Sequence, residues 1–185
     1  MTIPSMSDIA NMYRPLPLAV KELRINDQWL GRWSDADELP EHAPVGYVYA
    51  TLYSADKGYL VRPKGSQDVW EAIDDETGGE DPEAWLRREV PARTGLQVGK
   101  LVLMGFLECR ATKFNDVPKE TIQVRPLYIV IAKKVDDVPD GSGYERRRVI
   151  LNDYLAAMRN RYPEIRAYME RAHDRYLTMR AKGEA

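Results

Sequence analysis

Hydrophobic and polar residues alternate most regularly between residues 45 and 63. Positions 48, 50 and 52 carry aliphatic side chains, whereas the positions between them carry Tyr or Thr. The letters SADKG at 54–58 then supply turn residues, and the apolar pattern resumes at Tyr59. Period-two alternation on both sides of a short turn is typical of a β-hairpin. We therefore predict two antiparallel strands here.

Two longer runs of apolar and β-branched residues, at 100–112 and 121–135, have the length and composition of strands. Hydrophobic residues then recur at helical spacing, first from Tyr144 to Tyr162 and again after Pro163. The C-terminal part of the chain is therefore predicted to form two helices.

Five of the first 44 residues are prolines. Proline fixes φ and lacks a backbone N–H, so this segment is expected to hold short strands and loops rather than a long helix. Residues 18–25 are predicted to form one edge strand. Trp29 and Trp33 follow, four residues apart. They either cap the core or form a stacking wall for a base or sugar.

A charged helix is predicted inside the stretch from 70 to 96, after a loop rich in Asp and Glu. Asp81 suits the N-cap and Pro82 the first helical position. Pro91 is expected to kink or stop the last turn, because it cannot donate to the carbonyl four residues earlier. Gly95 suits the position just past the helix end.

The predicted order is hairpin, acidic loop, helix, two strands and two helices, which fits an α/β (α+β) protein with a mixed sheet between helices. We expect a single domain overall. It has an N-terminal extension at 1–44, a core at 45–135 and a C-terminal helical segment at 136–185 packed on the core.

Composition narrows the class of protein. With 185 residues, 44% of them hydrophobic and 30% charged, the chain has the make-up of a globular protein. No apolar run is long enough to span a bilayer, and the single cysteine, Cys109, excludes an internal disulfide framework. We therefore expect a cytoplasmic protein without a membrane partner.

The charge distribution and the positions of the histidines argue against nucleic-acid binding and against a zinc site. The net charge is only −2, although residues 144–185 carry ten Lys or Arg against six Asp or Glu. Nucleic-acid binding is therefore a minor hypothesis, confined to this basic tail. The two histidines, His42 and His173, lie far apart in the sequence, which argues against a zinc site. Cys109 is expected to be a buried small hydrophobe.

The acidic loop, the helix start and the pair Arg88-Glu89 resemble the Nudix box. Six residues stand at the matching spacing: Glu80, Arg88, Glu89, Val90, Gly95 and Leu96. Three positions depart from the pattern. Asp74 stands in place of the opening glycine, and Ala92 and Arg93 stand in place of two glutamates that bind metal in the family.

The resemblance implies an α/β/α sandwich that splits a phosphoanhydride in a nucleoside diphosphate linked to another moiety. It implies Mg or Mn as the cofactor and an activated water as the nucleophile. Glu89 and Glu80 would be the catalytic carboxylates, and Asp74 and Asp75 could complete a rearranged metal site. Glu120 lies between the two long strands, where some Nudix enzymes take their general base.

The departures weaken the hydrolytic interpretation. Ala92 offers no ligand, and Arg93 lies one helical turn after Glu89, where the two side chains can pair. Arg88 and Arg93 could instead bind a phosphate directly, since a guanidinium matches phosphate geometry. The opposing interpretation pairs Arg88 with a loop carboxylate and Arg93 with Glu89.

Three functions therefore stay open. The leading one is binding of a nucleoside-diphosphate-type or other phosphorylated ligand without ordinary metal-dependent hydrolysis. The second is an active hydrolase with a relocated Mg or Mn site, and the third is a protein-interaction or regulatory module. The acidic loop could also be only a solvated surface. The tyrosines and arginines of the C-terminal helices pack on the core, or form a homodimer interface, or contact nucleic acid.

Overall fold

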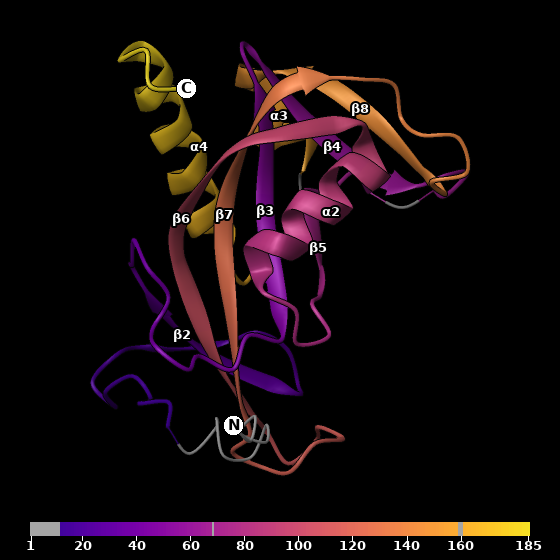
Figure 1. The fold of residues 1–185 in the computed structure, drawn as a ribbon. Coiled ribbons are helices and arrows are strands. Elements are labelled where there is room, and N and C mark those ends of the chain that lie inside the picture. Colours follow the sequence, from indigo (N-terminus) through magenta and orange to yellow (C-terminus); the bar gives the residue numbers. More distant parts are fainter. Residues whose placement is uncertain (1–11, 68, 159–160) are drawn as a thin grey trace, which may run out of the picture.

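The polypeptide forms one mixed sheet with helices on both faces (Figure 1). The computed structural model describes residues 12–67, 69–158 and 161–185. Within this part of the chain the sheet has eight strands in the order β1-β2-β6-β7-β3-β4-β8, and β5 also pairs with β3. The strands are β1 (Glu22–Arg24), β2 (Trp29–Ser34), β3 (Tyr47–Ser54), β4 (Lys57–Pro63), β5 (Ile73–Glu76), β6 (Leu96–Ala111), β7 (Ile122–Val135) and β8 (Tyr144–Ile150).

Pairing of β3 with β7 is parallel, and the other named pairs are antiparallel. The helices are α2 (Pro82–Thr94), α3 (Tyr154–Ala157) and α4 (Arg166–Ala181), with a 3-10 turn η1 (Leu151–Asp153) before α3. The predicted mixed sheet between helices is therefore confirmed, as are the hairpin β3–β4 and the two long strands β6 and β7. None of the described helices is long and apolar enough to cross a membrane.

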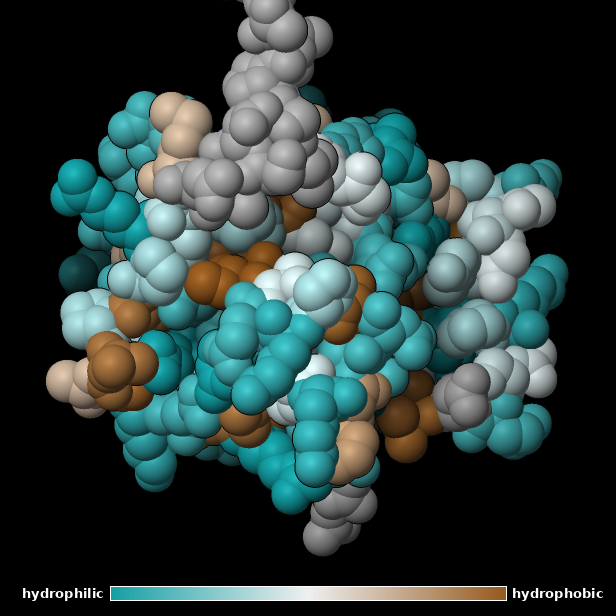
Figure 2. Space-filling model, turned by 90° about the horizontal axis from the view of Figure 1, so that it is seen from below, coloured by the Kyte–Doolittle hydropathy of each residue, from teal (hydrophilic) through white to brown (hydrophobic). Residues whose placement is uncertain are grey.

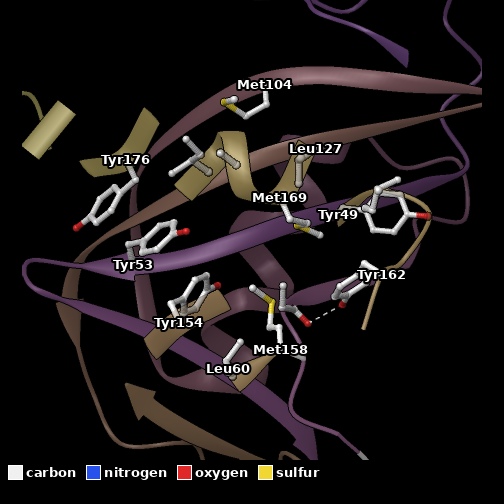
Figure 3. Packing of buried hydrophobic residues seen from close by; sticks show 14 of the residues in the cluster. Tyr49, Tyr53, Leu60, Met104, Leu127, Tyr154, Met158, Tyr162, Met169 and Tyr176 are labelled. Carbon is white, nitrogen blue, oxygen red and sulfur yellow. Dashed lines mark hydrogen bonds between the residues drawn. The ribbon is translucent and has the colours of Figure 1, made fainter. Parts of the chain in front are cut away.

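Strand β3 is buried on both faces because its side chains alternate between two cores. Val48, Ala50 and Leu52 pack with the apolar residues of α2. Tyr49 and Tyr53 point to the opposite face, where α3 and α4 pack. Figure 3 shows this second core, in which the tyrosine rings gather around β3. The two helical layers thus pack on opposite faces of the same strand.

Tyr53 lies at the centre of the second core. Its ring stacks on Tyr176 with centroids 4.0 Å apart and lies 4.8 Å from Tyr154 (Figure 3). Its hydroxyl is 3.0 Å from Nδ1 of His173 on α4. Because each buried hydroxyl finds a partner, the aromatic core fixes the position of α4 as well as excluding water.

Three sequence predictions need correction. The helix predicted from Tyr144 to Tyr162 is wrong for residues 144–150, which form strand β8 and pair with β4 along its whole length; the α-helix α3 covers only Tyr154–Ala157. The edge of β4 supplies backbone hydrogen bonds that helical periodicity alone does not reveal. The acidic loop also contains a strand, β5, which pairs with β3. The edge strand predicted at 18–25 is shorter and covers only 22–24.

Helix α2 begins as predicted. Asp81 accepts a hydrogen bond from the backbone N–H of Ala84 at 2.9 Å, and Pro82 occupies the first turn. Pro91 does not end the helix, which continues to Thr94, because only one intrahelical bond is lost and the last turn closes on Gly95.

Gly95 is required at the end of α2. Its φ of 73° is left-handed, and its N–H donates to the carbonyl of Pro91 at 2.9 Å. A Cβ built here would lie 2.3 Å from the carbonyl oxygen of Asp137. Both the backbone angle and the packing therefore exclude a side chain.

Candidate functional site

Arg93 lies among the carboxylates of the box. Its Nε donates to Glu89 at 2.8 Å, one turn earlier on α2, and its second terminal nitrogen donates to Asp75 of β5 at 2.8 Å. The guanidinium also lies over the rings of Trp85 and Tyr144, 5.2 and 5.1 Å from their centroids. Partial burial opposes the charge, but the bonds to Asp75 and Glu89 outweigh it and raise the pKa of Arg93.

Arg88 links the same cluster to the loop before α2. It donates to Glu80 at 2.6 Å and also pairs with Glu89. Three carboxylates from β5, the loop and α2 are thus joined through two guanidinium groups. The predicted Glu89–Arg93 pair and the pairing of Arg88 with a loop carboxylate both form.

Asp74 points away from this cluster. Adjacent residues of a strand point to opposite faces, so Asp75 contacts α2 whereas Asp74 lies on the α4 face. There it accepts hydrogen bonds from the hydroxyls of Tyr47 at 2.6 Å and Tyr162 at 2.9 Å, and Arg161 lies 3.5 Å away. The structure therefore does not bring Asp74 together with Asp75.

Glu120 also lies away from the carboxylates of the box. It lies in the loop between β6 and β7 and pairs with Arg110 at 3.0 Å. Its neighbours belong to the β1–β2 end of the sheet, since Arg110 also pairs with Glu22 of β1 at 2.9 Å. Of the carboxylates predicted for the site, only Asp75, Glu80 and Glu89 gather at the start and face of α2.

The box residues do not fit a divalent cation in this arrangement. Such a cation needs several carboxylate or carbonyl oxygens turned toward one point. Here the carboxylates of Asp75 and Glu89 turn toward the guanidinium of Arg93, which repels a cation. Within 12–67, 69–158 and 161–185, no group of three or more His, Cys, Asp or Glu side chains is arranged to hold a metal.

A polar cavity of about 400 Å³ opens on the α4 face of the sheet, and we call it the Arg125 cavity. Its walls include Trp29 of β2, Tyr47 and Tyr49 of β3, and Gln123 and Arg125 of β7. Its other lining residues are Ile25, Asn26, Asp74, Glu76, Arg161, Tyr162 and Glu164. Strands distant in sequence meet here because β3 and β7 are neighbours in the sheet.

Arg125 is the unusual group of this cavity. The residue is only 8% exposed, yet no described carboxylate lies within 4.0 Å of its guanidinium. It donates to the side-chain oxygen of Gln123 at 2.8 Å and to the hydroxyl of Tyr49 at 3.4 Å. The rings of Trp29 and Tyr47 each lie 5.0 Å from it. A permanent positive charge is thus held by neutral partners alone.

The Arg125 cavity adjoins the box. A smaller cavity of about 200 Å³ is lined by Asp75, Arg93 and Tyr144, and it shares Tyr47, Asp74 and Arg161 with the Arg125 cavity. Tyr47, Asp74 and Arg161 therefore form the boundary between the two spaces.

Arg125 is absent from the site predicted by sequence. The sequence signal for Arg125 is a charged residue inside the largely apolar run QVRPLYIVI, where burial of the charge is costly unless it has a partner. Trp29 was predicted either as a core cap or as a stacking wall, and its half-buried ring now lines the cavity. Cys109 is buried, as predicted, and burial raises the pKa of its thiol to about 11.

No protein-family model matches the chain, and no curated protein matches it. Among solved structures, the chain is similar to the Bacillus subtilis pyrophosphohydrolase BsRppH, with 19% sequence identity and a TM-score of 0.47. The similarity covers 69% of this chain and 77% of that chain. A putative Nudix hydrolase shares 13% identity over 70% of each chain, with a TM-score of 0.47. A MutT protein from Bacillus halodurans shares 16% identity over 60% of this chain and 71% of its own, with a TM-score of 0.42.

The α/β/α arrangement rests on the strands and helices of this chain.

Proposed function

We propose that this protein binds a phosphorylated small molecule of the nucleoside-diphosphate type in the Arg125 cavity, without ordinary metal-dependent hydrolysis at the box. The observation that carries the proposal is the buried guanidinium of Arg125, which has no carboxylate partner among the described residues.

A buried charge held only by neutral groups is costly, because desolvation of an ion amounts to several kcal/mol. A phosphate placed against Arg125 offsets that cost and accepts two parallel hydrogen bonds from the planar guanidinium. Arg161 lines the same cavity and adds positive charge, although it pairs with Glu71 and Asp74. Asp74, Glu76 and Glu164 also line the cavity, so we expect the anionic group at Arg125 on the β7 wall rather than elsewhere in it.

The remaining walls suit a planar group. Trp29 and Tyr47 present aromatic side chains to the cavity, and Asn26 and Gln123 add amides that can hydrogen-bond a base. A volume of about 400 Å³ lies within the usual range for small-molecule sites. An anion next to an aromatic wall is the combination that a nucleotide offers.

The residues of the box support the proposed absence of ordinary metal-dependent hydrolysis. Arg93 takes the carboxylates of Glu89 and Asp75 as its own partners, so a cation would have to displace a guanidinium that makes two ion pairs. Ala92 offers no replacement ligand.

The test uses ADP-ribose, a dinucleoside polyphosphate, a nucleotide sugar and NADH. We expect at least one of them to raise the melting temperature of the protein, because a ligand that binds only the folded state stabilises it. No nucleoside monophosphate should be released with Mg²⁺ or Mn²⁺. Arg125→Gln should abolish the stabilisation. Arg147→Gln is the matched control, because Arg147 is exposed on β8, away from the cavity.

Two results would overturn the proposal. One is that the stabilising ligand binds Arg125→Gln as tightly as it binds the wild-type protein. The other is metal-dependent turnover at the box, which Glu89→Gln abolishes.

The second outcome would favour an active hydrolase with a relocated Mg or Mn site. One observation supports this alternative: Asp75, Glu80 and Glu89 already gather around two arginines, so displacement of Arg93 would leave three carboxylates close to one another. If no ligand of the panel binds or reacts, a protein-interaction role becomes the best interpretation. The homodimer through the C-terminal helices stays a prediction, which light scattering can decide.

A further inference from the structure

A second cavity, of about 540 Å³, lies on the other face of the sheet, and we call it the Glu108 cavity. Trp29 of β2 lines the Arg125 cavity, whereas the alternate residues Leu30 and Arg32 line this one. The two cavities share no lining residue. Figure 2 views the molecule from the end where β2 lies in Figure 1, and small hydrophobic patches show there between hydrophilic side chains.

Glu108 of β6 is a buried carboxylate at this cavity, with the residue only 5% exposed. Its Oε2 accepts two hydrogen bonds of 2.7 Å, from the hydroxyl of Tyr13 and from the backbone N–H of Leu16. Its Oε1 accepts none from the described residues and is not sealed from solvent. No Lys, Arg or His of the described chain lies within 4.0 Å of the carboxylate.

The neighbouring guanidinium groups make no ion pair with Glu108, although Arg32 lies directly opposite it in the pairing of β2 with β6. Arg110 pairs with Glu22 at 2.9 Å and with Glu120 at 3.0 Å. Arg32 points toward Glu22 at 3.6 Å, and its Nε is buried without a partner. The cavity is thus lined by three carboxylates and two guanidinium groups, and both guanidinium groups are directed at Glu22 or Glu120.

The walls around this carboxylate are largely apolar. Leu16, Leu18, Leu30 and Ile122 line the cavity together with Pro15 and Pro17. Leu18 is among the exposed large hydrophobic residues, so part of the wall is open to solvent. A small molecule that has an apolar body and one positive end would satisfy both the carboxylate and the walls.

We propose that the Glu108 cavity binds an organic ammonium cation, with the ammonium on Oε1 of Glu108 and the hydrocarbon part against the leucine wall. An ammonium is compact and carries three donors, so it can reach a single open oxygen. A divalent metal is disfavoured because Glu22 and Glu120 already pair with Arg110, and an anion is disfavoured because the charge without a described ion pair at this cavity is a carboxylate. The site is independent of the Arg125 cavity and of any activity at the box.

The experiment uses the full chain and n-hexylamine, which is a cation at pH 7, with 1-hexanol and hexanoate as neutral and anionic probes of similar size. Binding is followed by the NMR shift of the Leu16 amide, which donates to Glu108. We expect the cation to bind about tenfold tighter than the alcohol. Both probes can donate a hydrogen bond to the carboxylate, but only the ammonium adds a charge–charge attraction to Glu108. Hexanoate should not bind.

Glu108→Gln tests whether the charge of Glu108, rather than its hydrogen bonds to Tyr13 and Leu16, recognises the cation. Its amide oxygen can still accept from Tyr13 and Leu16, while the charge is lost. The preference for the cation over the alcohol should disappear in this variant. It should persist in Glu83→Gln, whose side chain is exposed on α2 and does not line this cavity, and in Arg125→Gln on the other face.

The wild-type comparison decides the proposal even if Glu108→Gln fails to fold. If 1-hexanol binds as tightly as hexylammonium, or if the shift of Leu16 is the same with all three probes, the cavity has no cation site. If Glu108→Gln folds and keeps the preference, another group carries the recognition and the assignment to Glu108 is wrong.

Discussion

Replacing Arg93 with glutamine removes the guanidinium that joins α2 to β5. The change deletes two charge-assisted hydrogen bonds, to Glu89 and Asp75. It leaves Asp75 without a described ion pair and Glu89 paired only with Arg88. The side chains of Arg93, Glu89 and Asp75 are 14%, 18% and 48% exposed, so the pair with Glu89 is largely buried and the pair with Asp75 is half exposed. The expected effect therefore lies between those of buried and surface pairs.

The loss of folding free energy can be estimated from the burial of these two ion pairs. Breaking a buried pair costs roughly 3–5 kcal/mol, and an exposed pair contributes less than about 1 kcal/mol. Two cation–π contacts, with Trp85 and Tyr144, add about 0.5 kcal/mol each. We expect Arg93→Gln to lower the free energy of unfolding by about 2–3 kcal/mol. For a chain of 185 residues the melting temperature should fall by about 5–10 °C.

Urea denaturation and calorimetry measure this loss. The matched control is Arg87→Gln, because Arg87 is exposed on the same helix and has no described ion pair. The control should change the free energy of unfolding by less than about 0.5 kcal/mol. If both variants are as stable as the wild-type protein, Arg93 does not hold α2 against β5 and the reasoning about the box is refuted.

The second measurement is the stabilisation of each variant by Mg²⁺. In Arg93→Gln the guanidinium between Asp75 and Glu89 is gone and Glu89 keeps only its pair with Arg88, so Mg²⁺ should stabilise this variant. At ten times its dissociation constant the gain is about 1.4 kcal/mol. The wild-type protein and Arg87→Gln should show no such gain. Equal stabilisation of all three would mean that Arg93 does not occupy the place of a metal.

Three further predictions concern the scaffold. Gly95→Ala should lower the free energy of unfolding by at least about 2 kcal/mol in urea denaturation, since it combines a left-handed φ with a contact at 2.3 Å; a loss below half of that would contradict the cap geometry. Asp81→Ala should cost about 1 kcal/mol, because the N-cap bond to Ala84 is lost, whereas Asp81→Asn should retain most of it. Burial lowers the pKa of His173 below 6.5, so the unfolded chain takes up a proton first as the pH falls. Stability should therefore decrease below about pH 6.5, and His173→Gln should remove that part of the pH dependence.

Much of the candidate site could be predicted because it depends on residues close in sequence. Arg93 follows Glu89 by one helical turn, and helix geometry alone brings their side chains together. Asp81, Pro82 and Gly95 set the limits of α2 through local hydrogen bonds and backbone angles. The alternation in β3 similarly showed a strand, although both of its faces are covered by helices.

Predictions failed where distant segments decide the outcome. Residues 144–150 have a helical pattern but form β8, because the free edge of β4 offers backbone partners. Asp74 and Asp75 were grouped as ligands, yet pairing of β5 with β3 turns their side chains to opposite faces. A strand that forms by long-range pairing leaves no local periodic signal in four residues.

The sequence by itself determined the hairpin β3–β4, the limits of α2 and the conflict between Arg93 and a metal, because each follows from spacings of a few residues. Only the tertiary structure decided the charge environments of Arg125 and Glu108. Whether a buried charge has a partner depends on which strands are neighbours, and β2, β3, β6 and β7 meet only in the folded sheet. The two cavities that carry the proposals could not have been found without it.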